Sequence, residues 1–100
     1  MNTFSQYMVD FTFKDALSEE FFDLIPFQRV VINKFFQQKK LVNYALSIEN
    51  GKVWAIFNAN SKGEVWHLIN QLPLLKFMEV EISLLNQLDG EKAVPVFSLN

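Results

Sequence analysis

Apolar and polar residues alternate in two separate stretches of the chain. Over residues 4–13 one alternating set is mainly apolar, and the other includes the acid Asp10. Over residues 77–84 Glu79 and Glu81 share one face, while the other face is apolar. A period of two is typical of a strand with one face against a core. We therefore predict a strand in each stretch, each with a partly acidic face.

Residues 18–38 have helical periodicity instead. Ser18 precedes two glutamates, which is typical of a helix start, because a hydroxyl caps free N–H groups and early acids suit the helix dipole. Pro26 lies inside the pattern and should kink the helix or restart it. The stripe that faces a core recurs at three- and four-residue steps: Leu17, Phe21, Leu24, Gln28, Val31 and Phe35.

The same helix carries more apolar surface than one core needs. Its second stripe, about 100° around the helix from the first, consists of Phe22, Ile25, Ile32 and Phe36. An apolar patch of this kind usually marks an interface. We predict that it builds an assembly larger than a dimer. The alternative is that the kink at Pro26 and the C-terminal tail cover it.

Two short runs rich in β-branched and aromatic residues follow, at 41–48 and 52–59. An Asn-Gly dipeptide between them is a strong hairpin signal, so they should pair antiparallel. Ser61 and Glu64 then form a capping box, in which each side chain satisfies a backbone donor of the other. A second helix should therefore run over 62–72, with a buried face made of Val65, Leu68, Ile69 and Leu72.

The order of these elements is β-α-β-β-α-β, the split βαβ pattern of ferredoxin-like α+β domains. We predict one domain over residues 1–100, with a four-stranded antiparallel sheet and two helices on one face. The other face would be uncovered and would carry Asp10, Thr12, Trp54, Ile56, Phe77, Glu79 and Glu81. Its apolar part should be buried by a second copy of the chain, so we expect a homodimer with two sheets packed face to face.

Composition excludes several classes of function. The formal net charge is −2 and charges of both signs alternate, so no basic stripe exists for a nucleic acid. The absence of cysteine excludes a disulfide, a thiolate metal site and a thiol nucleophile. Three widely separated glycines exclude a phosphate loop or dinucleotide fingerprint. No segment predicts a membrane span or a signal peptide, so we expect a cytoplasmic protein.

Acidic side chains are the main chemical candidates. Asp10, Glu79 and Glu81 should project from neighbouring strands into one cleft, where carboxylates can act as general base and general acid. The alternative is that they lie at the rim of the sheet or pair with Lys14 or Lys76. No metal site is expected, because no histidine supports these acids and no calcium-type loop is present.

Residues 71–82, Gln-Leu-Pro-Leu-Leu-Lys-Phe-Met-Glu-Val-Glu-Ile, resemble the closing motif of the muconolactone isomerase family. Residues 9–14 and 53–57 are weaker matches, and the resemblance covers about residues 7–85. It implies a dimeric α+β barrel with a cleft between sheet and partner. It also implies an isomerase that needs no cofactor and moves a proton next to the carbonyl of a small lactone or enol acid.

On this interpretation Asp10, Glu81 and Glu79 are the candidate catalytic residues. The family carries a histidine and a lysine where this chain has Met8 and Asp10, so basic groups suited to a carboxylated lactone are missing. A second function therefore stays open, that of a non-catalytic small-ligand binder or structural oligomer. The candidate substrate-binding residues are Thr12, Tyr44, Trp54 and Phe77.

Two features lie outside this candidate site. The single histidine, His67, precedes Leu68 on the second helix and should face solvent. The tail, residues 86–100, contains a turn at Asp89-Gly90 and a short extended piece at 93–97. We expect this tail to contact a neighbouring subunit.

Overall fold

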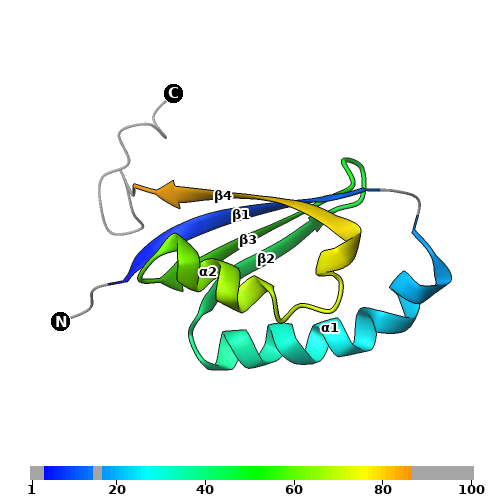
Figure 1. The fold of residues 1–100 in the computed structure, drawn as a ribbon, viewed down its shortest axis with the longest axis horizontal. Helices are drawn as coiled ribbons and strands as arrows, with labels where there is room; N and C mark the ends of the chain where they lie inside the picture. The colour runs from blue at the N-terminus through cyan, green and yellow to red at the C-terminus, as the bar shows by residue number, and fades with distance from the viewer. Residues whose placement is uncertain (1–3, 15–16, 87–100) are drawn as a thin grey trace, which may run out of the picture.

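The computed structural model describes residues 4–14 and 17–86. Its strands form one antiparallel sheet in the order β2-β3-β1-β4, and both helices lie on the same side of it (Figure 1). This is the predicted α+β ferredoxin-like fold with split βαβ topology. The elements in chain order are β1 (Ser5–Phe13), α1 (Glu19–Gln37), β2 (Leu41–Ser47), β3 (Lys52–Ala59), α2 (Lys62–Ile69), the 3₁₀ turn η1 (Leu75–Phe77) and β4 (Met78–Leu85).

The elements begin and end close to the predicted residues. α2 is shorter than predicted, although turn hydrogen bonds continue the chain as far as Leu72. The prediction for Phe77 was wrong, because this residue ends η1 instead of starting the last strand. Its backbone N–H donates to the Leu74 carbonyl at 3.0 Å, and its ring packs edge-on against Phe21 with centroids 5.4 Å apart. Phe77 therefore lies on the helix side of the sheet.

Both helices begin with the predicted serine caps. The Ser18 hydroxyl accepts from the Phe21 N–H at 3.2 Å, and the Ser61 hydroxyl accepts from the Glu64 N–H at 3.1 Å. The Glu64 carboxylate accepts from the N–H of Asn60 at 2.7 Å, one residue before the predicted partner. α1 continues through Pro26 and does not restart there, and its first turns are inclined to the rest of the helix (Figure 1).

The core lies between the sheet and the two helices. Alternate residues of β1 are buried, and so is the predicted apolar face of α2. In α1 the two predicted stripes were partly wrong: Ile32, assigned to the second stripe, is 6% exposed, whereas Leu17, assigned to the core stripe, is 40% exposed. The line that α1 turns toward the sheet runs between the two stripes, through Phe21, Gln28, Ile32 and Phe35.

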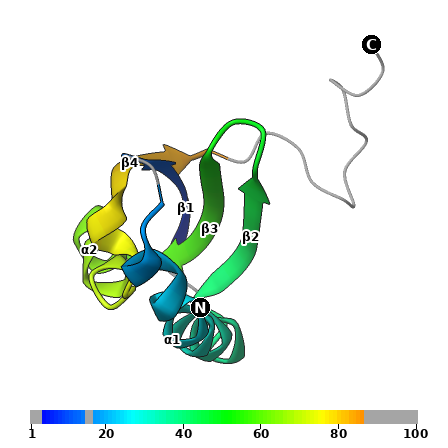
Figure 2. The same ribbon diagram turned by 90° about the vertical axis from the view of Figure 1, so that its right-hand side faces the viewer.

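No described element covers the opposite face of the sheet (Figure 2). Met8, Trp54 and Ile56 lie there, half-buried, next to one another in the register of β1 and β3. The predicted alternation between core-facing and outward-facing residues is thus confirmed for β1, β3 and β4. We call it the uncovered face.

Three further predictions concern other parts of the chain. His67 is exposed on α2, as predicted. Neither α1 nor α2, in the described part of the chain, is long and apolar enough to cross a membrane. The turn at 89–90 and the extended piece at 93–97 lie outside the described residues.

Candidate functional site

The predicted acidic residues share the uncovered face. Asp10 in β1 is paired with Glu81 in β4, and Thr12 is paired with Glu79 two residues further on. On the other side of β1, Trp54 of β3 is paired with Asp10. Cross-strand partners project from the same face of a sheet. The structure therefore brings together all three candidate catalytic residues and two of the four candidate binding residues.

Asp10 already has a partner on this face. The Lys52 ammonium lies 3.0 Å from Oδ2 and 3.1 Å from Oδ1 of Asp10, in a half-exposed ion pair. Lys76, which the sequence suggested as a partner for the acids, pairs with Glu20 instead. Among the described residues, no three His, Cys, Asp or Glu side chains gather in a way that could hold a metal ion.

The other two candidate binding residues lie on the opposite side of the sheet. Tyr44 of β2 is paired with Ala55 of β3, which is buried in the core, and Phe77 packs on Phe21 of α1. Tyr44 points to the core side of β2, and Phe77 lies in η1 on the helix side, so neither ring lines one monomer cleft together with Asp10. The prediction that Tyr44 and Phe77 form the walls of an acidic pocket is wrong for this reason.

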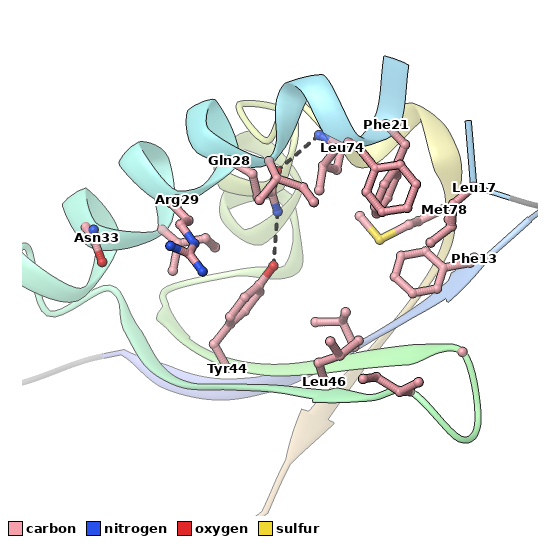
Figure 3. A pocket seen from close by; sticks show the side chains of 16 residues that line it. Phe13, Leu17, Phe21, Gln28, Arg29, Asn33, Tyr44, Leu46, Leu74 and Met78 are labelled. Carbon is pink, nitrogen blue, oxygen red and sulfur yellow. Dashed lines mark hydrogen bonds between the residues drawn. The ribbon is translucent and has the colours of Figure 1, made fainter. Parts of the chain in front are cut away.

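A large pocket lies on the helix side, between α1 and the end of the sheet formed by β2 and β3. Its volume is about 960 Å³ and its walls are mainly apolar. We call it the α1 pocket. Figure 3 shows α1 above it and the strands below, with side chains from both pointing into the space.

One end of the α1 pocket is aromatic and apolar. Phe13, Leu17, Phe21 and Met78 gather there (Figure 3). The rings of Phe13 and Phe21 meet edge to face, with centroids 5.5 Å apart and planes at 88°. An edge-to-face arrangement is favourable for two aromatic rings, so this end has packed, apolar walls.

The pocket wall also contains a hydrogen-bonded polar pair, of which Gln28 is buried and Tyr44 half-buried. Gln28 is only 4% exposed, and its Oε1 accepts from the backbone N–H of Leu74 at 3.1 Å. A backbone N–H can only donate, so this bond fixes which end of the amide faces Leu74. The amide nitrogen must then face the sheet, where it donates to the Tyr44 hydroxyl oxygen at 3.1 Å (Figure 3).

This arrangement determines what Tyr44 can offer to a ligand. Burial raises the pKa of the Tyr44 phenol above its ordinary value of 10.0, and the hydrogen bond from Gln28 opposes that rise only in part. The phenol is therefore protonated at neutral pH. Its oxygen accepts from Gln28, and no group within residues 4–14 and 17–86 accepts its own hydrogen. Tyr44 thus has one donor left for the pocket.

The other polar lining residues are Arg29 and Asn33 of α1. Figure 3 shows both at the same end of the pocket as Tyr44, away from the Phe13 and Phe21 rings. Arg29 carries the one formal charge among the lining side chains. Within the described part of the chain, no carboxylate lies within 4.0 Å of its guanidinium group. The pocket is therefore apolar at one end, and its other end is cationic and open to solvent, because Arg29 and Asn33 are exposed.

The sequence contained a signal for this pocket that we interpreted differently. Three residues of the second stripe of α1, Phe22, Ile25 and Ile32, line the pocket. We predicted a subunit contact there, because periodicity shows a surplus of apolar surface without showing what faces it. Gln28 was a second signal, since an amide inside a core stripe needs partners.

No protein-family model matches the sequence, and no curated protein matches it either. Among solved structures, that of muconolactone isomerase matches with a TM-score of 0.70, over 90% of this chain and 97% of that chain. The sequence identity is 12%, so this similarity concerns the fold alone. The chain therefore shares its α+β ferredoxin-like fold with muconolactone isomerase, and the resemblance suggested by the sequence holds at the level of the fold.

Proposed function

We propose that this protein binds a small, largely apolar molecule in the α1 pocket. The observation that carries the proposal is a mainly apolar space of about 960 Å³ with the hydrogen-bonded pair of Gln28 and Tyr44 in its wall. Ligand sites typically enclose about 300–1,000 Å³ and combine apolar walls with a few placed polar groups. The α1 pocket fits this description at the upper end of the volume range.

The lining of the pocket favours binding over proton-transfer chemistry. A general base must reach the substrate proton within about 2.6–3.2 Å, directly or through one water. The described lining residues include no aspartate, glutamate or histidine, and Tyr44 stays protonated at neutral pH because burial raises its pKa. Asp10, Glu79 and Glu81 project from the other face of the sheet. A molecule inside the pocket could donate no proton to them.

A matched pair of variants tests this function. Leu46→Trp would place an indole in the pocket, whereas Val42→Trp alters the same strand at a similarly exposed residue that does not line it. Ligand-observed NMR with a panel of small aliphatic and aromatic compounds should detect binding to the parent and to Val42→Trp. Binding should be lost in Leu46→Trp. Equal binding by both variants would place the ligand elsewhere and reject the α1 pocket.

A second candidate function uses the uncovered face. One solved structure that shares this fold is an isomerase, and the direct pairing of Asp10 with Glu81 favours a related activity here. On this alternative Asp10 and Glu81 transfer a proton on a small lactone or enol acid, with Glu79 beside them and Thr12 and Trp54 lining the site. Asp10→Asn and Glu81→Gln should then each abolish turnover of such substrates, measured by the loss of their ultraviolet absorbance. Absence of turnover by the parent protein across a lactone panel would reject this candidate.

We also propose that a second copy of the chain covers the uncovered face. Met8, Trp54 and Ile56 form an apolar centre there, and Asp10, Lys52 and the two glutamates surround it. An apolar centre with a polar rim is the usual pattern of a specific interface. Burial on the order of 800 Å² per subunit would be expected for a stable pair. Such a dimer leaves the α1 pocket on the outer side of each sheet.

A further inference from the structure

The two ends of the α1 pocket differ in chemistry, and this difference narrows the class of ligand. Phe13 and Phe21 form the apolar end, while Arg29, Asn33 and Tyr44 lie at the other end (Figure 3). A ligand that satisfies both ends must have an apolar body and a polar head. A wholly apolar molecule would use only the apolar end, because Arg29 and Asn33 at the other end are exposed to water.

The polar end offers mainly donors. The Arg29 guanidinium can only donate hydrogen bonds, and the Tyr44 oxygen already accepts from Gln28, so its hydroxyl is left to donate. Asn33 can donate or accept. The head of the ligand must therefore supply acceptor oxygens. An amine or an alkylammonium head is disfavoured, because it would face hydrogen-bond donors and a positive charge.

The positive charge at the polar end of the pocket determines which charge the head of the ligand should carry. Arg29 contributes a single positive charge, and no described carboxylate neutralises it. A carboxylate brings one negative charge and two acceptor oxygens, which match a guanidinium and a phenol donor. A phosphate monoester carries nearly two negative charges at neutral pH, and the single charge of Arg29 would balance only one of them.

Resting on the proposed binding function, we propose that the ligand of the α1 pocket is an amphiphilic monocarboxylic acid. Its carboxylate lies between Arg29 and Tyr44, and its apolar body extends toward Phe13 and Phe21. The body is either aliphatic or aromatic, because the aromatic end of the pocket can pack against both kinds of group. The Gln28 amide is a positioning group, since it holds the Tyr44 oxygen and leaves the hydroxyl hydrogen for the carboxylate.

Calorimetry with four probes tests the head group and the body. Octanoate and 1-naphthoate carry the proposed carboxylate head. Octanol lacks its negative charge, and octyl phosphate carries nearly two negative charges. Octanoate or 1-naphthoate should bind about threefold to tenfold more tightly than octanol or octyl phosphate, because water screens the pair with exposed Arg29 and the Tyr44 hydroxyl adds one hydrogen bond. The tighter of the two acids identifies the body as aliphatic or aromatic.

Two variants that each remove one positive charge from α1 distinguish a local contact with the ligand from an effect of the protein's overall charge. Arg29→Gln should weaken binding of the acid about twofold to fivefold, because Arg29 is exposed, and leave octanol unchanged. Lys34→Gln removes the same charge from the same helix at a residue that does not line the pocket, and should leave both affinities unchanged. Equal losses in the two variants would overturn the carboxylate assignment. Tyr44→Phe should weaken the acid about threefold to tenfold.

The outcomes distinguish this inference from the proposed function. If octanol binds as tightly as octanoate, and Leu46→Trp abolishes both, the pocket binds apolar molecules but the acid is not its ligand class. If none of the four probes binds, both the function and the ligand class are rejected. Tighter binding of octyl phosphate than of octanoate would replace the carboxylate by a phosphate head.

Discussion

Replacing Gln28 by Leu should destabilise the protein by more than the loss of one ordinary hydrogen bond. The substitution keeps an apolar side chain of similar size in a site that is 4% exposed, so no large cavity forms. It removes the acceptor of the Leu74 N–H and the donor to Tyr44. Leu74 is 6% exposed, so its N–H would be left buried without a partner. Leaving such a donor unsatisfied costs about 1–3 kcal/mol.

Tyr44→Phe provides the comparison within the same network. It removes the Gln28 to Tyr44 bond but leaves the Leu74 N–H satisfied, and the freed amide nitrogen can reach water in the pocket. Loss of one such bond costs about 0.5–1.5 kcal/mol. In the double variant the second change should cost little, because the bond that it removes is already absent.

Urea unfolding followed by circular dichroism would measure these differences, at one protein concentration for all variants. Gln37→Leu is the control, since it makes the same substitution at an exposed residue of α1 and should change stability by less than about 0.5 kcal/mol. A free energy of unfolding for Gln28→Leu equal to that of the control would refute the buried hydrogen-bond network.

Three further predictions follow from the same geometry. Phe22→Ser should weaken ligand binding about tenfold. Phe27→Ser changes a similarly exposed ring of α1 outside the pocket and should leave binding unchanged. Titration of both variants with the same ligand measures the difference. Ile56→Lys should convert a dimer into a monomer in light scattering, and an unchanged mass would exclude the uncovered face as the interface. Because burial raises the pKa of Tyr44, its contribution to stability is complete below the ordinary pKa of 10.0 and is lost as pH rises through the folded pKa. Urea unfolding at increasing alkaline pH should therefore show a larger loss for the parent than for Tyr44→Phe, and parallel curves would contradict the shift.

Most of the fold could be predicted because its signals are local. Period-two alternation identified β1 and β4, and the Asn-Gly turn identified the hairpin. The two serines placed the starts of both helices to within one residue. Each of these signals depends on neighbours within a few residues, so no long-range information was needed.

The candidate site was harder to predict because it depends on how distant elements face each other. The uncovered face and its acids followed from alternation alone, but the partner of Asp10 is Lys52, which is 42 residues away in the chain. The rotation of α1 about its axis placed Ile32 inside and left the pocket beside it. Packing against the sheet decides that rotation, and helical periodicity alone does not.

Because the sheet is a single layer, alternate residues of a strand belong to two different surfaces. This limits which sequence changes the fold can accept. In β1, Val9 and Phe11 belong to the core, and Asp10 and Thr12, which alternate with them, belong to the uncovered face. Substitutions can therefore alter one surface while the other is kept. An insertion or deletion of one residue in β1 would exchange the two sets, sending Asp10 into the core and aromatic rings outward. Related chains should accordingly vary in residue type along β1 but keep its length.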